Sequence, residues 1–180
     1  MSIVLQGSTS GSITLQEPAV SGSTVLSLPA VTGTVLTDTS PKAGNVIQVV
    51  QATYSTITSN STSTYADTGL TASITPTSSS SKILVLVSQN GCRKQGNDTY
   101  LQLRLVRGST TIATFAGAAA YTGTTTTNDI GSVSIEYLDS PATTSSTTYK
   151  TQLASGSNNA QVNVQTVSDT STITLMEIAA

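Results

Sequence analysis

Short alternations of apolar and polar residues run along most of this chain, and they predict β-strands. The segment 100–108, YLQLRLVRG, alternates cleanly from Leu101 to Leu105, so that Leu101, Leu103 and Leu105 fall on one face of a strand. The segment 82–87, KILVLV, is continuously apolar after Lys82, which predicts a central strand with both faces covered. No segment has the periodicity of an amphipathic helix.

Eight or nine such segments, separated by loops of Ser, Thr, Gly and Asn, predict an all-β fold of the β-sandwich or jelly-roll kind. The predicted strands are residues 46–54, 68–76, 82–87, 100–108, 110–117, 132–140, 147–154, 161–167 and 171–179. Gly108 and Ser109 predict a hairpin turn between two of them.

The first part of the chain has a different pattern. Pro-Ala-Val-Ser-Gly at 18–22 returns as Pro-Ala-Val-Thr-Gly at 29–33, and the apolar runs around this repeat are too short to bury themselves. Residues 37–45 predict a turn or linker. We therefore predict two parts, an extended anchor or neck at 1–43 and a jelly-roll domain at 44–180, with a flexible leader as the alternative for the first. The neck positions are Ile13, Leu15, Pro18, Val25, Leu28, Pro29, Val35 and Leu36.

Composition narrows the possible partners. Charged residues are 9% of the chain, the net charge is −2, and the seven Lys and Arg are scattered, which argues against nucleic-acid binding. No apolar run approaches the ~20 residues of a membrane span, and the start lacks the basic region of a secretory signal. Cys92 is the single cysteine, so no internal disulfide is expected.

The chain also lacks the usual residues of catalysis. It has no histidine, which excludes Ser-His-Asp and Cys-His arrangements and zinc sites built on His. Lys82 follows four serines, but we interpret it as a lysine at a strand end rather than a catalytic base. Glu136 and Asp139 are three apart on a predicted strand and should point to opposite faces. Asp129 could join other oxygens around Ca²⁺, but no run of oxygen ligands accompanies it. We expect no enzymatic activity, metal or cofactor.

Two stretches, 89–99 and 117–131, are the candidate distal loops. The first holds the densest charge cluster, and the second holds Tyr121, whereas Tyr137 and Tyr149 follow strand patterns and are expected in the core. A plain surface loop is the alternative to a contact loop. The candidate contact residues are Arg93, Lys94, Asp98, Tyr121 and Asp129.

Four stretches carry a resemblance to a known group of proteins. Residues 68–88, 101–113, 132–153 and 171–180 together resemble the trimeric jelly rolls of the C1q and tumour-necrosis-factor-like kind, in the form found in bacteriophage fibre and decoration proteins. Residues 11–37 are similar to the lead segments of phage virion fibres.

The resemblance implies a homotrimeric structural protein on the virion surface, made in the host cytoplasm, whose N-terminus attaches to other capsid or tail proteins. It also implies that apolar side chains of the three copies meet around a threefold axis. The candidates for these side chains are Leu101, Leu103, Leu105, Ile173 and Leu175. The alternative is that these five residues face the interior of the sandwich. A tip module that binds a host receptor or glycan is the alternative function. A secreted C1q-like protein is a third, against which the missing signal, collagen repeat and disulfides count.

Overall fold

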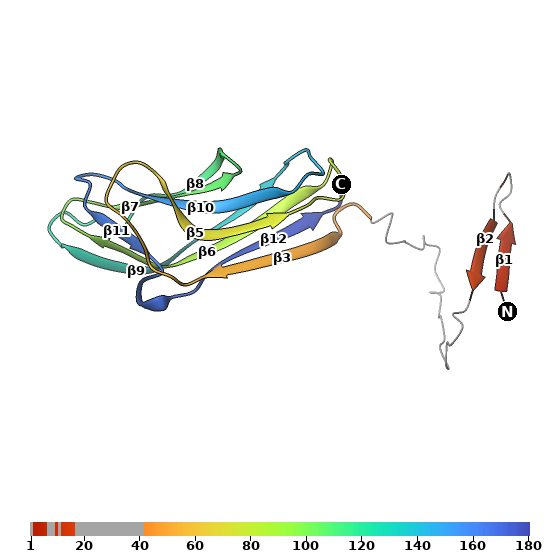
Figure 1. Ribbon diagram of the computed structural model, residues 1–180, viewed down its shortest axis with the longest axis horizontal. Helices are drawn as coiled ribbons and strands as arrows, with labels where there is room; N and C mark the ends of the chain where they lie inside the picture. Colours follow the sequence, from red (N-terminus) through yellow and green to blue (C-terminus); the bar gives the residue numbers. More distant parts are fainter. Residues whose placement is uncertain (1, 7–9, 11, 17–41) are drawn as a thin grey trace. The chain divides into compact units, whose positions relative to one another are not determined.

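The computed structural model describes residues 2–6, 10, 12–16 and 42–180, which fall into two compact units. The first unit, Met1–Val35, contains an antiparallel hairpin of β1 (Ser2–Gln6) and β2 (Ser12–Gln16) (Figure 1). Of the expected neck positions, Ile13 and Leu15 lie in β2. The others, Pro18, Val25, Leu28, Pro29, Val35 and Leu36, lie outside the described residues.

The second unit, Leu36–Ala180, contains a sandwich of two antiparallel sheets, which confirms the predicted all-β class (Figure 1). The small sheet has the order β5-β10-β7-β8; the large sheet has the order β3-β12-β6-β11-β4, with β9 paired along the other edge of β6. The elements are β3 (Val46–Tyr54), β4 (Thr58–Asn60), β5 (Ala66–Ile74), β6 (Lys82–Gln95), β7 (Leu101–Arg107), β8 (Thr110–Ala119), β9 (Thr127–Asp139), β10 (Thr147–Ser155), β11 (Gln161–Val164), the 3₁₀ turn η1 (Thr166–Ser168) and β12 (Ser171–Ile178). Among the described residues, no helix is long and apolar enough to cross a membrane.

All nine predicted strands of this unit are present, and most begin and end within two residues of their predicted limits. β6 is the main difference, because it continues beyond the apolar run 82–87 as far as Gln95. Its polar second half stays extended because it pairs with β9 on one side and with β11 on the other. β4 was not predicted, since its three residues are all polar.

The sandwich interior holds two apolar clusters. One gathers side chains from β5, β6, β10 and β12, and the other lies toward β11 and the far end of β7. The five residues proposed for a threefold axis, Leu101, Leu103, Leu105, Ile173 and Leu175, are all fully buried within this interior. Of the two positions open to them, they therefore occupy the sandwich core of one chain.

A belt of buried polar side chains separates the two clusters and joins the sheets. Thr68 and Thr151 share a hydrogen bond of 2.5 Å in the small sheet, and Thr151 donates to Gln89 Oε1 at 2.8 Å. Gln89 Nε2 then donates to Ser171 Oγ at 3.0 Å in the large sheet, and Gln165 Nε2 reaches the same oxygen at 3.1 Å. All five residues are fully buried. The belt therefore fixes the relative register of the two sheets.

Gln89→Met should lower the stability of the sandwich. The substitution keeps the volume but removes two buried hydrogen bonds, which costs about 2 kcal/mol, or roughly 6–10 °C in Tm. Thermal unfolding followed by circular dichroism measures the change. Gln102→Met is the matched control, because Gln102 lies half-buried on the outer face of β7 and should tolerate the same replacement. Equal melting temperatures for the two variants would contradict this role of the belt.

A buried carboxylate ties three segments together where β12 ends. Glu177 accepts hydrogen bonds from Gln48 Nε2 at 2.5 Å and from the backbone amide and hydroxyl of Thr77, both at 2.7 Å. Burial alone would raise the pKa of the Glu177 carboxyl, but the hydrogen bonds from Gln48 and Thr77 outweigh it and hold this pKa below its ordinary value. The charged form is therefore the one that stabilises the fold.

This lowered pKa predicts a pH dependence of stability. Because the folded-state pKa lies below the unfolded one, the contribution of Glu177 is complete above an unfolded pKa of about 4.3 and is lost as the pH falls through the folded value. Glu177→Gln should lower stability at pH 7 and flatten the fall of stability below about pH 4.3. Urea unfolding at several pH values measures both effects, with the unmodified chain as the reference. An acid limb of unchanged slope in Glu177→Gln would contradict the assignment.

Candidate binding surfaces

The two ends of the sandwich differ in what they carry. At one end the chain enters beside its own C-terminus, where Gly44 N donates to Ala179 O at 2.8 Å and Ala179 N donates to Asn45 O at 2.9 Å. At the other end lie the loops 96–100, 120–126 and 156–160, which we call the loop end. The two predicted distal stretches both reach this end, although much of each is strand.

The loop end brings Tyr121 and Asp98 together, as a contact site would require. Tyr121 Oη donates to Asp98 Oδ1 at 3.0 Å, and this hydrogen bond raises the pKa of the phenol above its ordinary value. The Tyr121 ring meets Tyr100 edge to face, with ring centroids 6.1 Å apart. Tyr121 is nonetheless 53% exposed. An aromatic ring and a carboxylate are therefore held side by side on the surface.

The other predicted contact residues have more structural roles. Arg93 and Asp129 form an ion pair across the β6–β9 ladder, on partly exposed side chains. Lys94 is fully buried, and its amine donates to Thr122 O at 2.6 Å. The buried Lys94 side chain therefore links the loop 120–126 to β6. It is not a surface contact, so the prediction for this residue was wrong.

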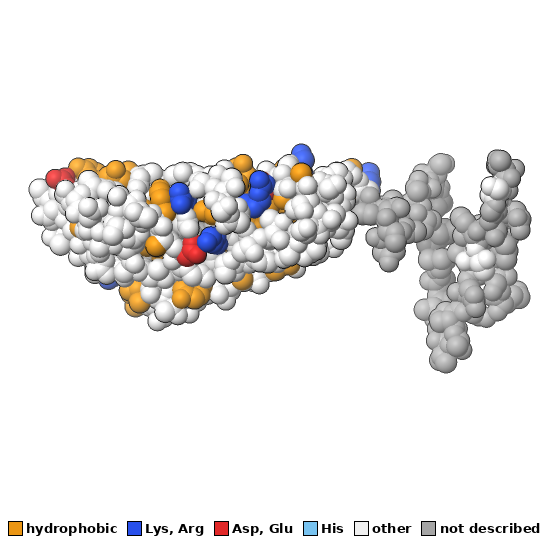
Figure 2. Space-filling model, turned by 45° about the horizontal axis from the view of Figure 1, so that its top comes forward, with side chains coloured by type: hydrophobic (Ala, Val, Ile, Leu, Met, Phe, Trp, Pro, Cys, Tyr) orange, Lys and Arg blue, Asp and Glu red, His pale blue; other side chains and the backbone are white. Residues whose placement is uncertain are grey.

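The outer face of the small sheet is polar and internally bonded. Arg104 lies over the Tyr65 ring, with Cζ 3.9 Å from its centroid, and its Nε donates to Gln152 Oε1 at 2.8 Å. Gln152 and Lys150 both bind the Asp67 carboxylate, at 2.6 and 2.8 Å. Figure 2 brings this layer forward and shows a mostly uncharged polar surface with scattered apolar patches and a few charged groups. This is an ordinary solvent-facing surface.

The outer face of the large sheet is different, because it carries a row of large apolar side chains. In register across four strands lie Val49, Met176, Leu84 and Leu138, which we call the apolar band. Val49 is 56% exposed and Leu138 is 51% exposed, while Leu84 and Met176 are half-buried. The band was signalled by the run KILVLV, which predicts a strand with both faces covered. Within one chain only the inner face is covered.

A shallow hollow of about 310 Å³ lies beside the apolar band on the same outer face. Its floor follows the cross-strand row of Thr172, Ser88 and Ser134, which have short side chains. Leu86 and Glu136, in the next row toward the band, form its wall. The hollow therefore arises where small residues follow large ones along the same strands.

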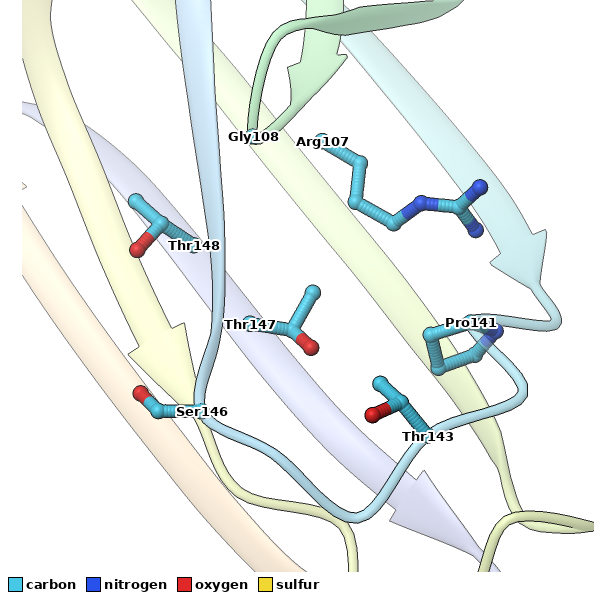
Figure 3. Close-up of a pocket in the computed structure, with 7 residues that line it drawn as sticks. All are labelled: Arg107, Gly108, Pro141, Thr143, Ser146, Thr147 and Thr148. Atoms are coloured by element: carbon cyan, nitrogen blue, oxygen red, sulfur yellow. The ribbon is translucent and has the colours of Figure 1, made fainter.

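A second depression, of about 290 Å³, lies between the β7–β8 turn and the loop that leads from β9 into β10 (Figure 3). Hydroxyl groups of the 143–148 stretch line it, and Arg107 supplies its charge. Arg107 Nη1, however, already binds both oxygens of Asp139, at 2.8 and 2.7 Å, and Tyr149 Oη donates to the same carboxylate at 2.6 Å. Burial and the neighbouring Asp139 raise the pKa of Tyr149 far above its ordinary value. The arginine is thus neutralised by a structural partner, and the depression offers no strong anion site.

Among the described residues, no group of three or more His, Cys, Asp and Glu side chains could hold a metal ion. Glu136 is exposed on the outer face while Asp139 is buried, so these two carboxylates do point to opposite faces. Lys82 is exposed at the start of β6, as expected for a lysine at a strand end.

Comparisons with known proteins give no family for this chain. No protein-family model and no curated protein matches it. Among solved structures, the VP2 subviral particle of infectious bursal disease virus is similar over 73% of this chain and 32% of that one, at 16% identity and a TM-score of 0.43. The structure of the Gt strain of infectious bursal disease virus is similar over 98% of this chain and 46% of that one, at 13% identity and a TM-score of 0.36. The chain thus spans less than half the length of either virus protein.

Proposed function

We propose that this chain is a non-enzymatic structural protein of a virion, a short fibre or decoration of a bacteriophage that acts as a homotrimer. The observation that carries the proposal is the apolar band on the outer face of the large sheet. Three copies bury their bands against one another, and the N-terminal unit attaches to a capsid or tail protein. The sandwich is displayed on the particle surface.

The contrast between the two outer faces supports association through the large sheet. The small sheet presents charged and amide groups that bind one another, whereas the large sheet presents aliphatic groups to water. Burying apolar area stabilises a contact by about 25 cal/mol per Å². The net charge of −2 per chain adds little repulsion between copies.

The placement of the ends supports outward display. The chain enters the sandwich at Gly44 and Asn45, at the end opposite the loop end. A protein held through its N-terminal unit can therefore present the loops 96–100, 120–126 and 156–160 away from the attachment point. The resemblance to phage fibre and decoration proteins, which residues 11–37, 68–88, 101–113, 132–153 and 171–180 carry, and the absence of histidine favour this role over catalysis.

Immunogold labelling of intact virus particles with an antibody to the sandwich tests the virion role. We expect gold on the particle surface, and its loss from particles made without this chain. The chain remaining entirely in the soluble fraction of infected cells, with unlabelled particles, would contradict the proposal.

The loop end favours a second function, recognition of a host-surface glycan. Tyr121 provides an exposed ring on which a sugar can stack, and Asp98 provides acceptors for its hydroxyl groups. Hydrogen bonds between the three loops, such as Thr126 Oγ1 to Asn97 Oδ1 at 2.9 Å, hold the site in place without a ligand. This function is compatible with a trimeric virion protein.

Tyr121→Ala should weaken glycan binding roughly tenfold or more, because it removes the stacking surface. Tyr121→Phe is the paired variant; it keeps the ring and loses only the hydrogen bond to Asp98, so most of the binding should remain. A glycan array probed with the full chain, followed by titration of any ligand found, measures both. Uniform absence of binding to the array and to host cells by the unmodified chain would count against this second function.

A further inference from the structure

The turn that links β11 to β12 has an unusual backbone. Gln165, Val167 and Ser168 all have positive φ, of 55°, 56° and 62°. This conformation is unfavourable for a β-branched residue such as Val167, whose Cβ crowds the backbone. Val167 is also 84% exposed. In the isolated chain Val167 is therefore unfavourable in two ways. Its backbone is strained, and its aliphatic side chain is exposed to water.

Several contacts with β6 hold the turn in this conformation. Gln165 N donates to Asn90 O at 2.8 Å, and Thr166 Oγ1 donates to Gly91 O at 3.1 Å. Gly91 has φ +60°, and a Cβ there would lie 2.3 Å from the amide nitrogen of Thr166. The turn therefore packs closely against β6. These contacts hold its backbone in the unfavourable conformation.

The turn projects from the same side of the sandwich as the apolar band. Figure 1 shows η1 as the small dark-blue turn below the layer of β3, β9 and β12, away from the layer of β5, β8 and β10. Ile57 is 55% exposed and precedes Thr58, which pairs with Val164 just before the turn. We call the exposed side chain of Val167 the knob.

We propose that the knob of one copy enters the hollow of the next copy in the assembly, and this inference rests on the proposed trimer. The knob is aliphatic and convex, and the hollow beside Leu86, Ser88, Ser134 and Thr172 is concave and lined by methyl and methylene groups as well as hydroxyls. Both lie on one side of the same chain. Identical copies can therefore repeat the contact head to tail until the ring closes.

The size of the apolar band supports this wider contact. Four strands at ~4.8 Å spacing and five residues at ~3.4 Å give the band roughly 300 Å², whereas a stable interface buries about 800 Å² on each partner. The 14 residues of β6 extend the same face along the hollow toward the knob. This face is four strands wide beside β12, at residues 82–88 of β6, and again beside β11, at 93–95, which together give roughly 650 Å². The knob and the hollow therefore supply most of the area that the band alone lacks.

The contact also has a predicted charge signature. Asp169 follows the knob, and Glu136 lines the hollow, so the proposed contact brings two carboxylates toward one another. Glu136→Gln and added salt should therefore both strengthen the assembly.

Engineered cysteines test the proposal directly in the full-length protein. Val167→Cys combined with Ser134→Cys places a thiol on the knob and another in the hollow. The native Cys92 does not interfere, since it is fully buried and burial raises the pKa of its thiol to about 12. Mild oxidation, non-reducing gel electrophoresis and light scattering are applied to the double variant and to each single variant.

We expect a ladder of covalent dimers and trimers from the double variant and none from the single variants. A native trimer without cross-links in the double variant would overturn the knob contact and leave the proposed trimer standing. A cross-linked particle of two chains would support the contact and overturn the trimer. A native monomer would overturn both.

Val167→Gly provides a second test that does not depend on cross-linking geometry. Glycine relieves the strain at positive φ, so this variant should be at least as stable as the native chain when monomeric. It should nonetheless dissociate at a concentration at least tenfold higher, because the knob is gone. Unchanged dissociation on dilution would overturn the proposal, since a purely local role of Val167 would not weaken assembly.

Discussion

Leu84→Glu should convert the assembled protein into folded monomers. Leu84 lies at the centre of the apolar band on β6, between Met176 and Leu138. In the assembly the new carboxylate would be buried against aliphatic groups without a partner, which costs several kcal/mol for each copy. In the monomer the same side chain points outward, so the sandwich should keep its circular dichroism spectrum. Light scattering on a sizing column measures the change in mass.

The control for this prediction is Gln102→Glu. It adds the same charge to a central strand, but on the polar outer face of the small sheet. It should leave the native mass unchanged. Equal dissociation of both variants would mean that net charge, and not the position of the band, governs assembly.

Asp139→Leu should be the most destabilising of the polar substitutions considered. Its carboxylate is almost fully buried and binds both Arg107 and the buried Tyr149 hydroxyl. Leucine would leave that hydroxyl and one side of the guanidinium without an acceptor, at a cost of about 3–5 kcal/mol. Thermal unfolding should show a Tm lower by roughly 10–15 °C.

Asp67→Leu is the matched comparison, because Asp67 also binds two side chains, Lys150 and Gln152. Its side chain is 52% exposed, against 7% for Asp139, so water replaces the lost partners. We expect a change below about 1 kcal/mol. Equal losses of stability in Asp139→Leu and Asp67→Leu would contradict the claim that burial makes the Asp139 hydrogen bonds stabilising.

The strands of the sandwich could be predicted from sequence because alternation reports directly on a two-sided sheet. Leu101, Leu103 and Leu105 alternate with polar residues, and the structure buries all three. The same alternation cannot say whether a buried leucine faces its own chain or a neighbouring one. Their position inside one chain follows only from the second sheet, which covers all three.

The outer face of the large sheet was harder to predict, because it depends on register between distant strands. Val49, Leu84, Leu138 and Met176 are far apart in sequence and become neighbours only through three strand pairings. Lys94 was predicted as a surface contact because it stands in the densest charge cluster of the sequence, in a stretch predicted to be a loop. The carbonyl of Thr122 that accepts its hydrogen bond comes from a loop whose path no local pattern reveals.

The strained turn at Val167 was likewise outside the reach of pattern analysis. QVNVQTV reads as a continuous alternation through residue 167, but the strand ends at Val164. Beyond it the chain adopts positive φ at Gln165 and Val167, where contacts with Gly91 and Asn90 override local preference.

The central claim is that copies of this chain assemble through the large sheet. The most direct test is the native mass of the purified full-length chain, measured by light scattering on a sizing column beside Leu84→Glu. The account predicts a mass three times the 18.3 kDa of one chain for the native protein, and the mass of one chain for the variant. A native protein of one chain per particle would contradict it.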